Sequence, residues 1–183
     1  MIQCVFVQFS KEDDKMVKDT ILVIDVDVDG IQEIMNILSD SYRICTAGSF
    51  EDALLIIRDI IPELILIDST MSAKDGFDIL EFLKTNDKSS HIPVIFITPL
   101  DNPDFEVRAF DMGSVDYITK PFVPKVVRKR IETQIKLAKY EHKLEELVEE
   151  KVSEIEDMYD IMAISFAGLV ESRDGITGGH LKN

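Results

Sequence analysis

The chain has 183 residues, a formal net charge of −15, 45% hydrophobic residues and 30% charged residues. This length suits one domain with an appendage, and the composition is that of an ordinary globular protein. Because an acidic surface repels phosphate backbones, the charge argues against nucleic-acid binding. The two cysteines, Cys4 and Cys45, are too few for a disulfide framework and fit a reducing cytoplasm. We therefore expect a cytoplasmic protein with no membrane contact, since we find no apolar run of membrane-spanning length and no signal-peptide pattern.

Apolar runs alternate with helical patterns from residue 20 to about residue 140. Short apolar runs rich in β-branched residues predict strands that are buried on both faces, as in a parallel sheet. The expected strands are Ile21–Ile24, Tyr42–Ala47, Leu64–Ile67, Val94–Ile97 and Asp116–Thr119. The expected helices between them are Gly30–Leu38, Phe50–Ile61, Phe77–Leu83 and Pro103–Met112. This alternation predicts a doubly wound α/β fold with a five-stranded parallel sheet.

Capping and turn residues predict several boundaries within this pattern. Ser49 is a typical N-cap for the helix that begins at Phe50. Gly113 is the expected C-cap of the helix that starts at Pro103. The pair Asp75-Gly76 predicts a turn that closes a loop before the next helix.

Four of the expected strands end on a residue that is suited to phosphate chemistry. These residues are Asp25, Asp68, Thr98 and Lys120. In a parallel α/β sheet, ligands bind at the carboxyl ends of the strands. The fold is therefore expected to collect these four side chains in one pocket.

Beyond residue 125 the sequence becomes a long helical pattern with no proline up to residue 173. Apolar residues recur there at alternating steps of four and three: Val148, Val152, Ile155, Tyr159, Met162, Phe166 and Leu169. This spacing is typical of the seam of a two-stranded coiled coil. We expect residues 125–172 to form a linker helix that makes a homodimer, and the alternative is an amphipathic helix lying on its own domain.

Four segments carry a resemblance to a known family: ILVIDVDVDG, LILIDSTMSAKDGFDIL, IPVIFITPLD and GSVDYITKPF. In this order and spacing they resemble the CheY-like receiver domain of two-component response regulators, over residues 20 to about 123. The resemblance implies a flavodoxin-like sheet with strand order 2-1-3-4-5. It also implies a phosphoacceptor aspartate and a sensor histidine kinase as the phosphoryl donor.

The resemblance implies a role for each residue that matches a family motif. Asp68 matches the phosphoacceptor, and its carboxylate can act as a nucleophile that forms an acyl phosphate. Lys120 would contact a phosphate oxygen, and Pro121 would hold that loop through a cis bond. Thr98 and Tyr117 match the pair whose packing changes with phosphorylation.

The resemblance also implies a Mg²⁺ ion held by Asp25, Asp68 and the backbone carbonyl of Thr70. The family usually has two successive acidic residues after the first strand, whereas here Val26 follows Asp25. Valine supplies no oxygen ligand to Mg²⁺. Asp27 could substitute if its loop bends inward. We therefore expect weakened Mg²⁺ binding and slower phosphorylation, with the fold retained.

The final segment, FAGLVESRDGITGGHLKN, resembles the opening of the HD-GYP phosphodiesterase domain. That resemblance implies a parent protein that hydrolyses cyclic di-GMP, in which His180 would match a histidine near the metal site. The His-Asp and Gly-Tyr-Pro motifs of that family are absent from this sequence, so this chain is not expected to be an enzyme.

These observations predict four parts of the chain: an N-terminal extension (1–18), a receiver domain (19–124), a linker helix (125–172) and the start of an output domain (173–183). The expected function is to accept a phosphoryl group on Asp68 and to relay the change through the helix to an output domain. The alternative is a pseudo-receiver, a binding and dimerisation module whose phosphorylation is impaired by Val26.

Overall fold

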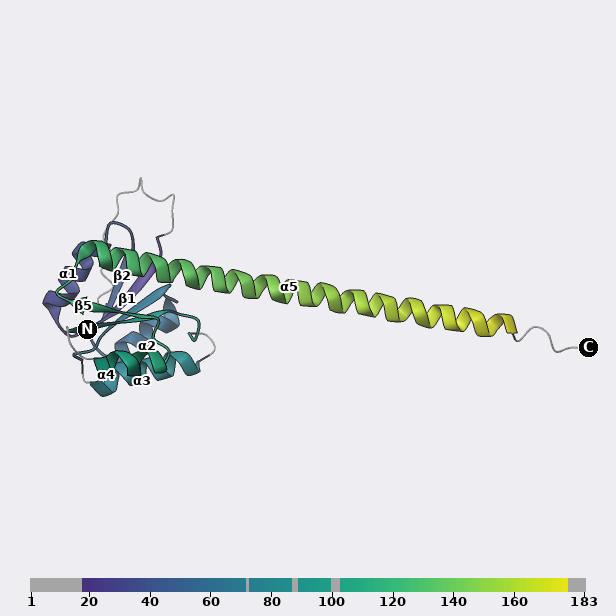
Figure 1. Ribbon diagram of the computed structural model, residues 1–183, viewed down its shortest axis with the longest axis horizontal. Coiled ribbons are helices and arrows are strands. Elements are labelled where there is room, and N and C mark those ends of the chain that lie inside the picture. The colour runs from purple at the N-terminus through teal and green to yellow at the C-terminus, as the bar shows by residue number, and fades with distance from the viewer. Residues whose placement is uncertain (1–17, 72, 87–88, 100–102, 178–183) are drawn as a thin grey trace, which may run out of the picture. The chain divides into compact units, whose positions relative to one another are not determined.

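The computed structural model describes residues 18–71, 73–86, 89–99 and 103–177. Within these ranges, strands and helices alternate along the chain (Figure 1). The strands are β1 (Thr20–Ile24), β2 (Arg43–Ala47), β3 (Leu64–Asp68), β4 (Val94–Pro99) and β5 (Asp116–Lys120). The helices are α1 (Val28–Leu38), α2 (Phe50–Asp59), α3 (Ala73–Thr85), α4 (Pro103–Asp111) and α5 (Pro124–Thr177).

The strands form one parallel sheet in the order β2-β1-β3-β4-β5, which confirms the predicted order. β1 lies between β2 and β3, and its Ile24 pairs with Ala47 on one side and with Ile67 on the other. Every residue of β1 and β3 is buried. Because both faces of these strands are covered, they are continuous apolar runs rather than alternating ones.

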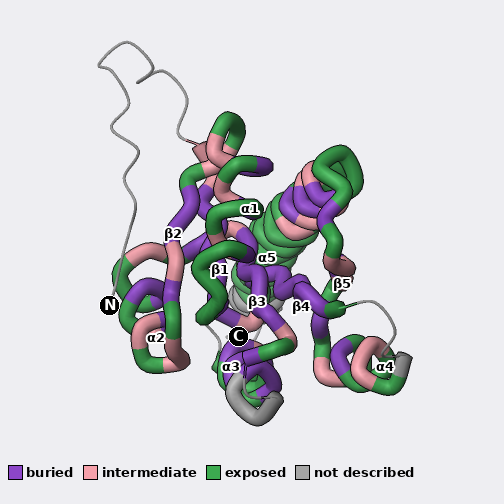
Figure 2. The backbone as a smooth tube through the Cα atoms, turned by 90° about the vertical axis from the view of Figure 1, so that its left-hand side faces the viewer, coloured by how far each residue is buried: buried purple, intermediate pink, exposed green. Residues whose placement is uncertain are grey.

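Two hydrophobic layers, one on each face of the sheet, attach the helices. One layer includes Ala53 of α2, Leu80 of α3 and Ala109 of α4. The other includes Ile34 of α1 and Ile131 of α5. Figure 2 shows the buried strands between helices whose outer surfaces are exposed. The sheet is thus a well-packed platform for the residues at its carboxyl edge.

Side-chain caps set the starts of two helices. The Asp27 carboxylate accepts a hydrogen bond from the backbone N–H of Gly30 at 3.2 Å, so α1 begins at Val28 rather than at Gly30. The Ser49 hydroxyl accepts from the N–H of Asp52 at 3.1 Å, which confirms the predicted N-cap of α2.

The helix ends agree with the predictions to within a few residues. Gly113 follows α4 with φ of +97°, a left-handed conformation that favours glycine, as expected of its C-cap. α2 ends at Asp59 rather than at Ile61, because Ile60 adopts an extended backbone conformation.

The turn predicted at Asp75-Gly76 is wrong. α3 begins at Ala73, so both residues lie in its first turn. A Cβ atom at Gly76 would lie only 3.3 Å from Cε1 of Phe96, on the sheet. Glycine therefore allows the helix to pack closely on the sheet here. In the sequence, a glycine with this role looks the same as a glycine in a turn.

The first turns of α5 belong to the core of the receiver-like unit. Val127, Ile131 and Ile135 are buried in the layer that also contains α1. The chain divides into a compact unit that ends at Lys139 and a second unit that begins at Tyr140. The first unit thus extends beyond residue 124, where the sequence pattern placed the boundary.

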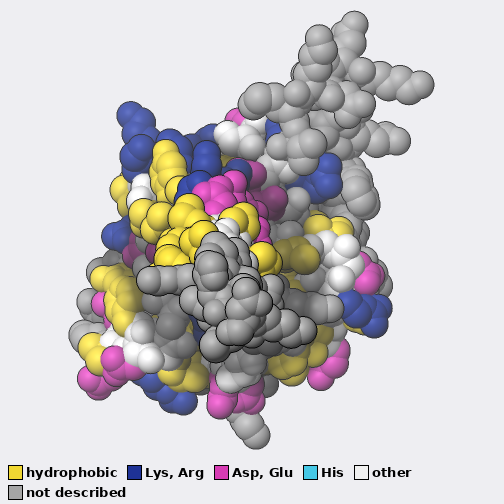
Figure 3. All heavy atoms as spheres, turned by 90° about the vertical axis from the view of Figure 1, so that its right-hand side faces the viewer, with side chains coloured by type: hydrophobic (Ala, Val, Ile, Leu, Met, Phe, Trp, Pro, Cys, Tyr) yellow, Lys and Arg dark blue, Asp and Glu magenta, His cyan; other side chains and the backbone are white. Residues whose placement is uncertain are grey.

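The second unit exposes its apolar side chains. The seven residues of the predicted seam, Val148 to Leu169, are each 47–67% exposed. Hydrophobic side chains also lie between acidic and basic ones on the face drawn in Figure 3. In the part of the chain that the structure describes, we find no helix that is both long and apolar enough to cross a membrane.

Candidate functional site

Four side chains from the carboxyl edge of the sheet lie at the ends of neighbouring strands. Asp25 follows β1, Asp68 ends β3, Thr98 lies near the end of β4 and Lys120 ends β5. The strand register holds them level, because Asp68 pairs with Ile97 and Thr98 pairs with Thr119. Asp25, Asp68 and Thr98 are each at most 2% exposed.

Lys120 joins the two buried carboxylates. Its Nζ lies 2.5 Å from Oδ2 of Asp68 and 3.9 Å from Oδ2 of Asp25. Burial lowers the pKa of Lys120, but the hydrogen bond and charge of Asp68 and the charge of Asp25 outweigh it, so the net pKa is raised. One ammonium group faces two carboxylates here, which leaves a negative excess.

Asp68 and Asp25 respond to this environment in opposite directions. Burial raises the pKa of Asp68, but hydrogen bonds from Lys120 and Thr70 outweigh it, so the net pKa is lowered. Burial, together with the charge of Asp68, raises the pKa of Asp25, although a hydrogen bond from Asp27 opposes this. Asp68 is therefore the carboxylate that stays ionised more readily.

Thr70 contacts Asp68 in a way that the sequence reasoning missed. Its backbone N–H and its hydroxyl both donate to Oδ1 of Asp68, at 2.6 and 2.5 Å. The prediction assigned only the carbonyl of Thr70, as a metal ligand. The spacing Asp68-Ser69-Thr70 is the available signal, because an aspartate commonly accepts from the backbone two residues on.

Gly30 marks the point on which the charged groups converge, and it too was missed. A Cβ atom at Gly30 would lie 3.0 Å from Oδ2 of Asp25, 3.2 Å from Oδ2 of Asp27 and 3.2 Å from Nζ of Lys120. The absence of a side chain thus leaves space where two carboxylates and an ammonium group meet. The available signal is Asp27, because aspartate is a common N-cap and Gly30, whose backbone N–H it accepts from, lies three positions later.

Val26 follows Asp25 at this site, and it is 60% exposed. The loop around it is held by the N–H of Asp27, which donates to Oδ1 of Asp25 at 2.7 Å. Asp27 is at the same time the N-cap of α1. Its carboxylate therefore lies at the rim of the pocket and is already used by backbone N–H groups.

The carboxylates present fit a Mg²⁺ ion that water and phosphate also ligate. Among the residues that the structure describes, no group of three or more His, Cys, Asp or Glu side chains is arranged to hold a metal. Mg²⁺ is commonly bound through one or two carboxylates, with water and phosphate oxygens completing its octahedron. The two buried carboxylates, Asp25 and Asp68, meet that lower requirement.

The residues expected to switch lie on neighbouring strands beside the pocket. The Thr98 hydroxyl donates to the backbone carbonyl of Pro99 at 3.2 Å. The Tyr117 ring contacts Phe110 edge to face at 5.9 Å. A hydrogen bond with Glu106 raises the pKa of the Tyr117 hydroxyl.

The peptide bond between Lys120 and Pro121 is cis, the conformation expected from the sequence. Two other predictions, on His180 and on residues 1–17, lie outside the described residues.

Curated relatives match about two thirds or more of this chain. A protein from Vibrio cholerae serotype O1 named "Probable cyclic di-GMP phosphodiesterase" is 34% identical over 169 residues, which are 88% of this chain and 38% of that protein. The phosphate regulon transcriptional regulatory protein PhoB from Pseudomonas aeruginosa is 30% identical over 123 residues, which are 66% of this chain and 53% of PhoB. The chain thus spans only part of the length of these relatives.

Solved structures share the fold. NtrX from Brucella abortus, crystallised with ADP, is 29% identical, with a TM-score of 0.65 over 72% of this chain and 29% of that one. The chemotaxis response regulator CheY4 of Vibrio cholerae is 20% identical, with a TM-score of 0.59 over 64% of this chain and 99% of that one. The response regulator receiver domain family matches residues 21–132, which contain every residue of the pocket described above. The chain therefore belongs to the response regulator receiver domain family.

Proposed function

We propose that Asp68 accepts a phosphoryl group from the phosphohistidine of a sensor histidine kinase. An oxygen of Asp68 attacks the phosphorus, the P–N bond breaks, and its electron pair leaves with the imidazole. The observation that carries this proposal is the double support of Asp68, by Thr70 on Oδ1 and by Lys120 on Oδ2. These donors keep the nucleophile ionised and oriented, and phosphoryl transfer asks little more of a protein.

Mg²⁺ is the cofactor that fits this reaction, since receiver domains typically bind it for phosphorylation. Asp25, Asp68 and the carbonyl of Thr70 would hold it, and Asp27 is the additional carboxylate at the rim. When bound, the ion neutralises charge on the phosphoryl oxygens. Val26 supplies no oxygen, so we expect weaker Mg²⁺ affinity than a second acidic residue would provide.

The phosphorylated state is proposed to change the packing of Thr98 and Tyr117 and to pass through α5 to an output domain. The exposed seam of α5 supports a homodimer, because apolar side chains at heptad spacing gain burial when two helices pair. The name of the Vibrio cholerae relative supports a cyclic di-GMP phosphodiesterase as the output of a longer parent protein. The hydrolysis itself is not attributed to this chain.

The phosphorylation is tested with acetyl phosphate and Mg²⁺, followed by intact-protein mass. We expect one phosphoryl group on the wild type, none on Asp68→Asn, and faster labelling of Val26→Asp. Val28→Asp is the matched control, because it adds the same charge at an exposed position of α1. Absence of labelling in both the wild type and Val26→Asp would refute the proposal.

The dimer is tested separately by sedimentation of the full chain, with and without beryllofluoride, which mimics the phosphoryl group. Ile155→Asp should dissociate the dimer because it places a charge in the seam. Ile164→Asp is the control, because Ile164 is 73% exposed and lies outside the heptad positions of the seam. Equal effects of the two variants would contradict pairing through this seam.

A second candidate is the pseudo-receiver, a dimerisation module that is not phosphorylated efficiently. The position of Val26 favours it, because this residue is exposed and brings no oxygen to the pocket. Two results together would favour this candidate over the first. Val26→Asp would be phosphorylated while the wild type is not, and the dimer population would not change when Mg²⁺ and beryllofluoride are added.

A further inference from the structure

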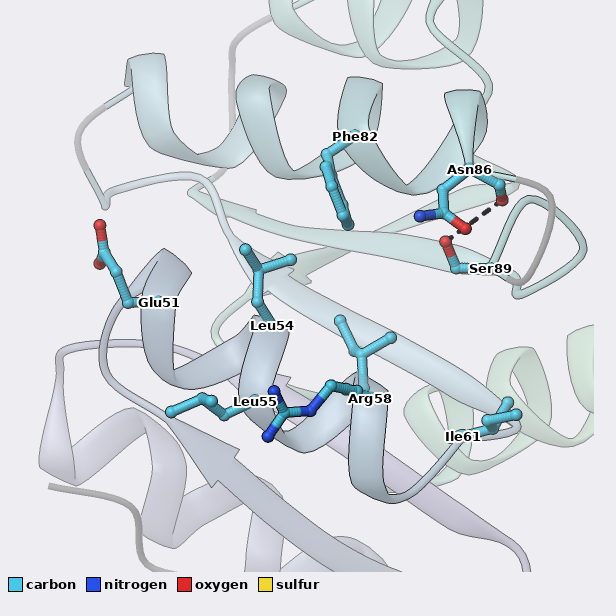
Figure 4. Close-up of a pocket in the computed structure, with 9 residues that line it drawn as sticks. Glu51, Leu54, Leu55, Arg58, Ile61, Phe82, Asn86 and Ser89 are labelled. Carbon is cyan, nitrogen blue, oxygen red and sulfur yellow. Dashed lines mark hydrogen bonds between the residues drawn. The ribbon is translucent and has the colours of Figure 1, made fainter.

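An apolar groove lies between α2 and α3 and contains none of the residues of the pocket described above. Its volume is about 560 Å³. Figure 4 shows Leu54 of α2 and Phe82 of α3 pointing toward each other across the groove, with Glu51 near one end and Ile61 near the other. It is large enough to hold several side chains of a peptide segment.

The groove is apolar and exposed to solvent. Leu55, Ile61 and Phe82 are 40%, 58% and 36% exposed. The hydroxyl of Ser89, at the rim, already donates to the backbone carbonyl of Leu83 at 3.0 Å. An exposed apolar surface of this kind usually has a partner. Five of the nine residues that line the groove are apolar, which favours a peptide segment with apolar side chains.

The chain enters β1 beside one end of the groove. The N–H of Thr20 donates to Oε2 of Glu63 at 2.6 Å, and the N–H of Glu63 donates to the carbonyl of Thr20 at 2.9 Å. Glu63 follows Ile61, which lines the groove, by two positions. Residues 1–17 are therefore joined to the described chain close to the Ile61 end.

The length of this segment suits the groove. Residues 10–17, if extended, span roughly 26 Å at about 3.3 Å per residue. The groove runs along α2 from Ile61 to Glu51, a distance of roughly 15 Å at about 1.5 Å per residue. The preceding residues can therefore lie along the whole groove while the tether remains slack.

The composition of the segment matches the groove as well. Residues 1–9, MIQCVFVQF, include seven apolar residues and no charged one. Left in water, such a stretch is a site for aggregation. Because residues 1–9 are covalently tethered to the domain, their effective concentration at the groove is in the millimolar range. A separate partner of equal affinity has to exceed that concentration to displace them.

We propose that residues 1–9 bind in the α2–α3 groove of their own chain and cover Leu55, Ile61 and Phe82. This contact is independent of phosphorylation, since it uses none of the pocket residues. It gives the N-terminal extension a role as an intramolecular cover for this surface.

The first test is disulfide formation in the full chain between Cys4 and a cysteine introduced by Leu55→Cys. A disulfide requires Cα atoms about 4.4–6.8 Å apart, so it reports a close approach. Val115→Cys is the matched control, because Val115 has a similar exposure of 37%. Its N–H donates to the carbonyl of Val94 at the amino ends of the strands, where β1 also begins. Cys45 is buried and does not compete.

We expect the Cys4 cross-link to form roughly tenfold faster with Leu55→Cys than with Val115→Cys, and within one chain. Equal rates would mean that the segment is not held in the groove and would overturn the proposal. Cross-links that form only between chains would also overturn it, since the occupant would then be a second copy.

The second test is the alkylation rate of Cys4. Leu55→Asp should release the segment and raise the rate by roughly tenfold, whereas the apolar Leu55→Met should leave it unchanged. Circular dichroism checks that both variants fold. A rate that Leu55→Asp does not change would contradict the proposal, whatever the result of the phosphorylation assay.

Discussion

Replacing Lys120 by methionine removes the ammonium group that faces Asp68 and Asp25 while keeping most of the side-chain volume. At 2.5 Å and an effective dielectric constant of about 20, the attraction to Asp68 is about 7 kcal/mol. Desolvation of the two charges offsets several kcal/mol of this. Because Asp68 would be left buried without its cation, we expect Lys120→Met to lower the free energy of unfolding by about 3–5 kcal/mol at neutral pH.

The assay is urea unfolding of the full chain followed by circular dichroism. Lys139→Met is the matched control, since Lys139 pairs with Asp19 at 2.6 Å but its side chain is 57% exposed. An exposed pair contributes about 1 kcal/mol or less, so the control should differ little from the wild type.

The loss in free energy of unfolding caused by Lys120→Met should also depend on pH. Without the cation, burial still raises the pKa of Asp68 while the hydrogen bond and charge of Lys120 no longer lower it, so this pKa is higher in the variant than in the wild type. Acid therefore destabilises the folded variant less than the folded wild type. The difference from the wild type should therefore shrink as the pH falls from neutral toward the ordinary aspartate value of 3.8. A loss below about 1 kcal/mol, or a deficit that does not change with pH, would refute the assignment of this ion pair as buried and strong.

Four further variants test the site and the fold. Val26→Asp should raise Mg²⁺ affinity roughly tenfold in calorimetric titration, because it adds an oxygen ligand. Gly30→Ala should reduce labelling by acetyl phosphate by up to about 100-fold, because the added methyl group displaces Nζ of Lys120. The free energy of unfolding should change by less than about 1 kcal/mol, since alanine favours the helix. Asp68→Asn should be less stable than the wild type at neutral pH, where the lowered pKa of Asp68 contributes its full stability. The difference should shrink as the pH falls below 3.8 and through the lowered pKa of Asp68; a difference that does not shrink in acid would contradict this. Ser49→Ala should cost about 1 kcal/mol in urea unfolding, through the lost cap of α2.

Some features of the site follow from local patterns alone. The ends of four apolar runs predicted Asp25, Asp68, Thr98 and Lys120, because the carboxyl ends of parallel strands lie at one edge of a sheet. Strand order followed from the resemblance of those runs to a known family. The N-cap at Ser49 was also predictable, since it depends on residues three positions apart.

Other features depend on residues that are distant in sequence and could not be read from a pattern. Gly30 is important because Lys120 lies next to it, and Gly76 because Phe96 does. The first turns of α5 looked like the start of a linker, yet Ile131 is completely buried against the sheet. A helical pattern states which residues share a face, but not what that face will contact.

The amino-acid sequence by itself determined the order of the elements, the fold class and the four strand-end residues, because each depends on spacing within a short segment. Only the tertiary structure decided that Thr70 donates to one oxygen of Asp68 and Lys120 to the other, that the charges converge at Gly30 and that the first compact unit extends to Lys139. Those are facts about distances across the fold, and they exist only once the strands and helices have packed.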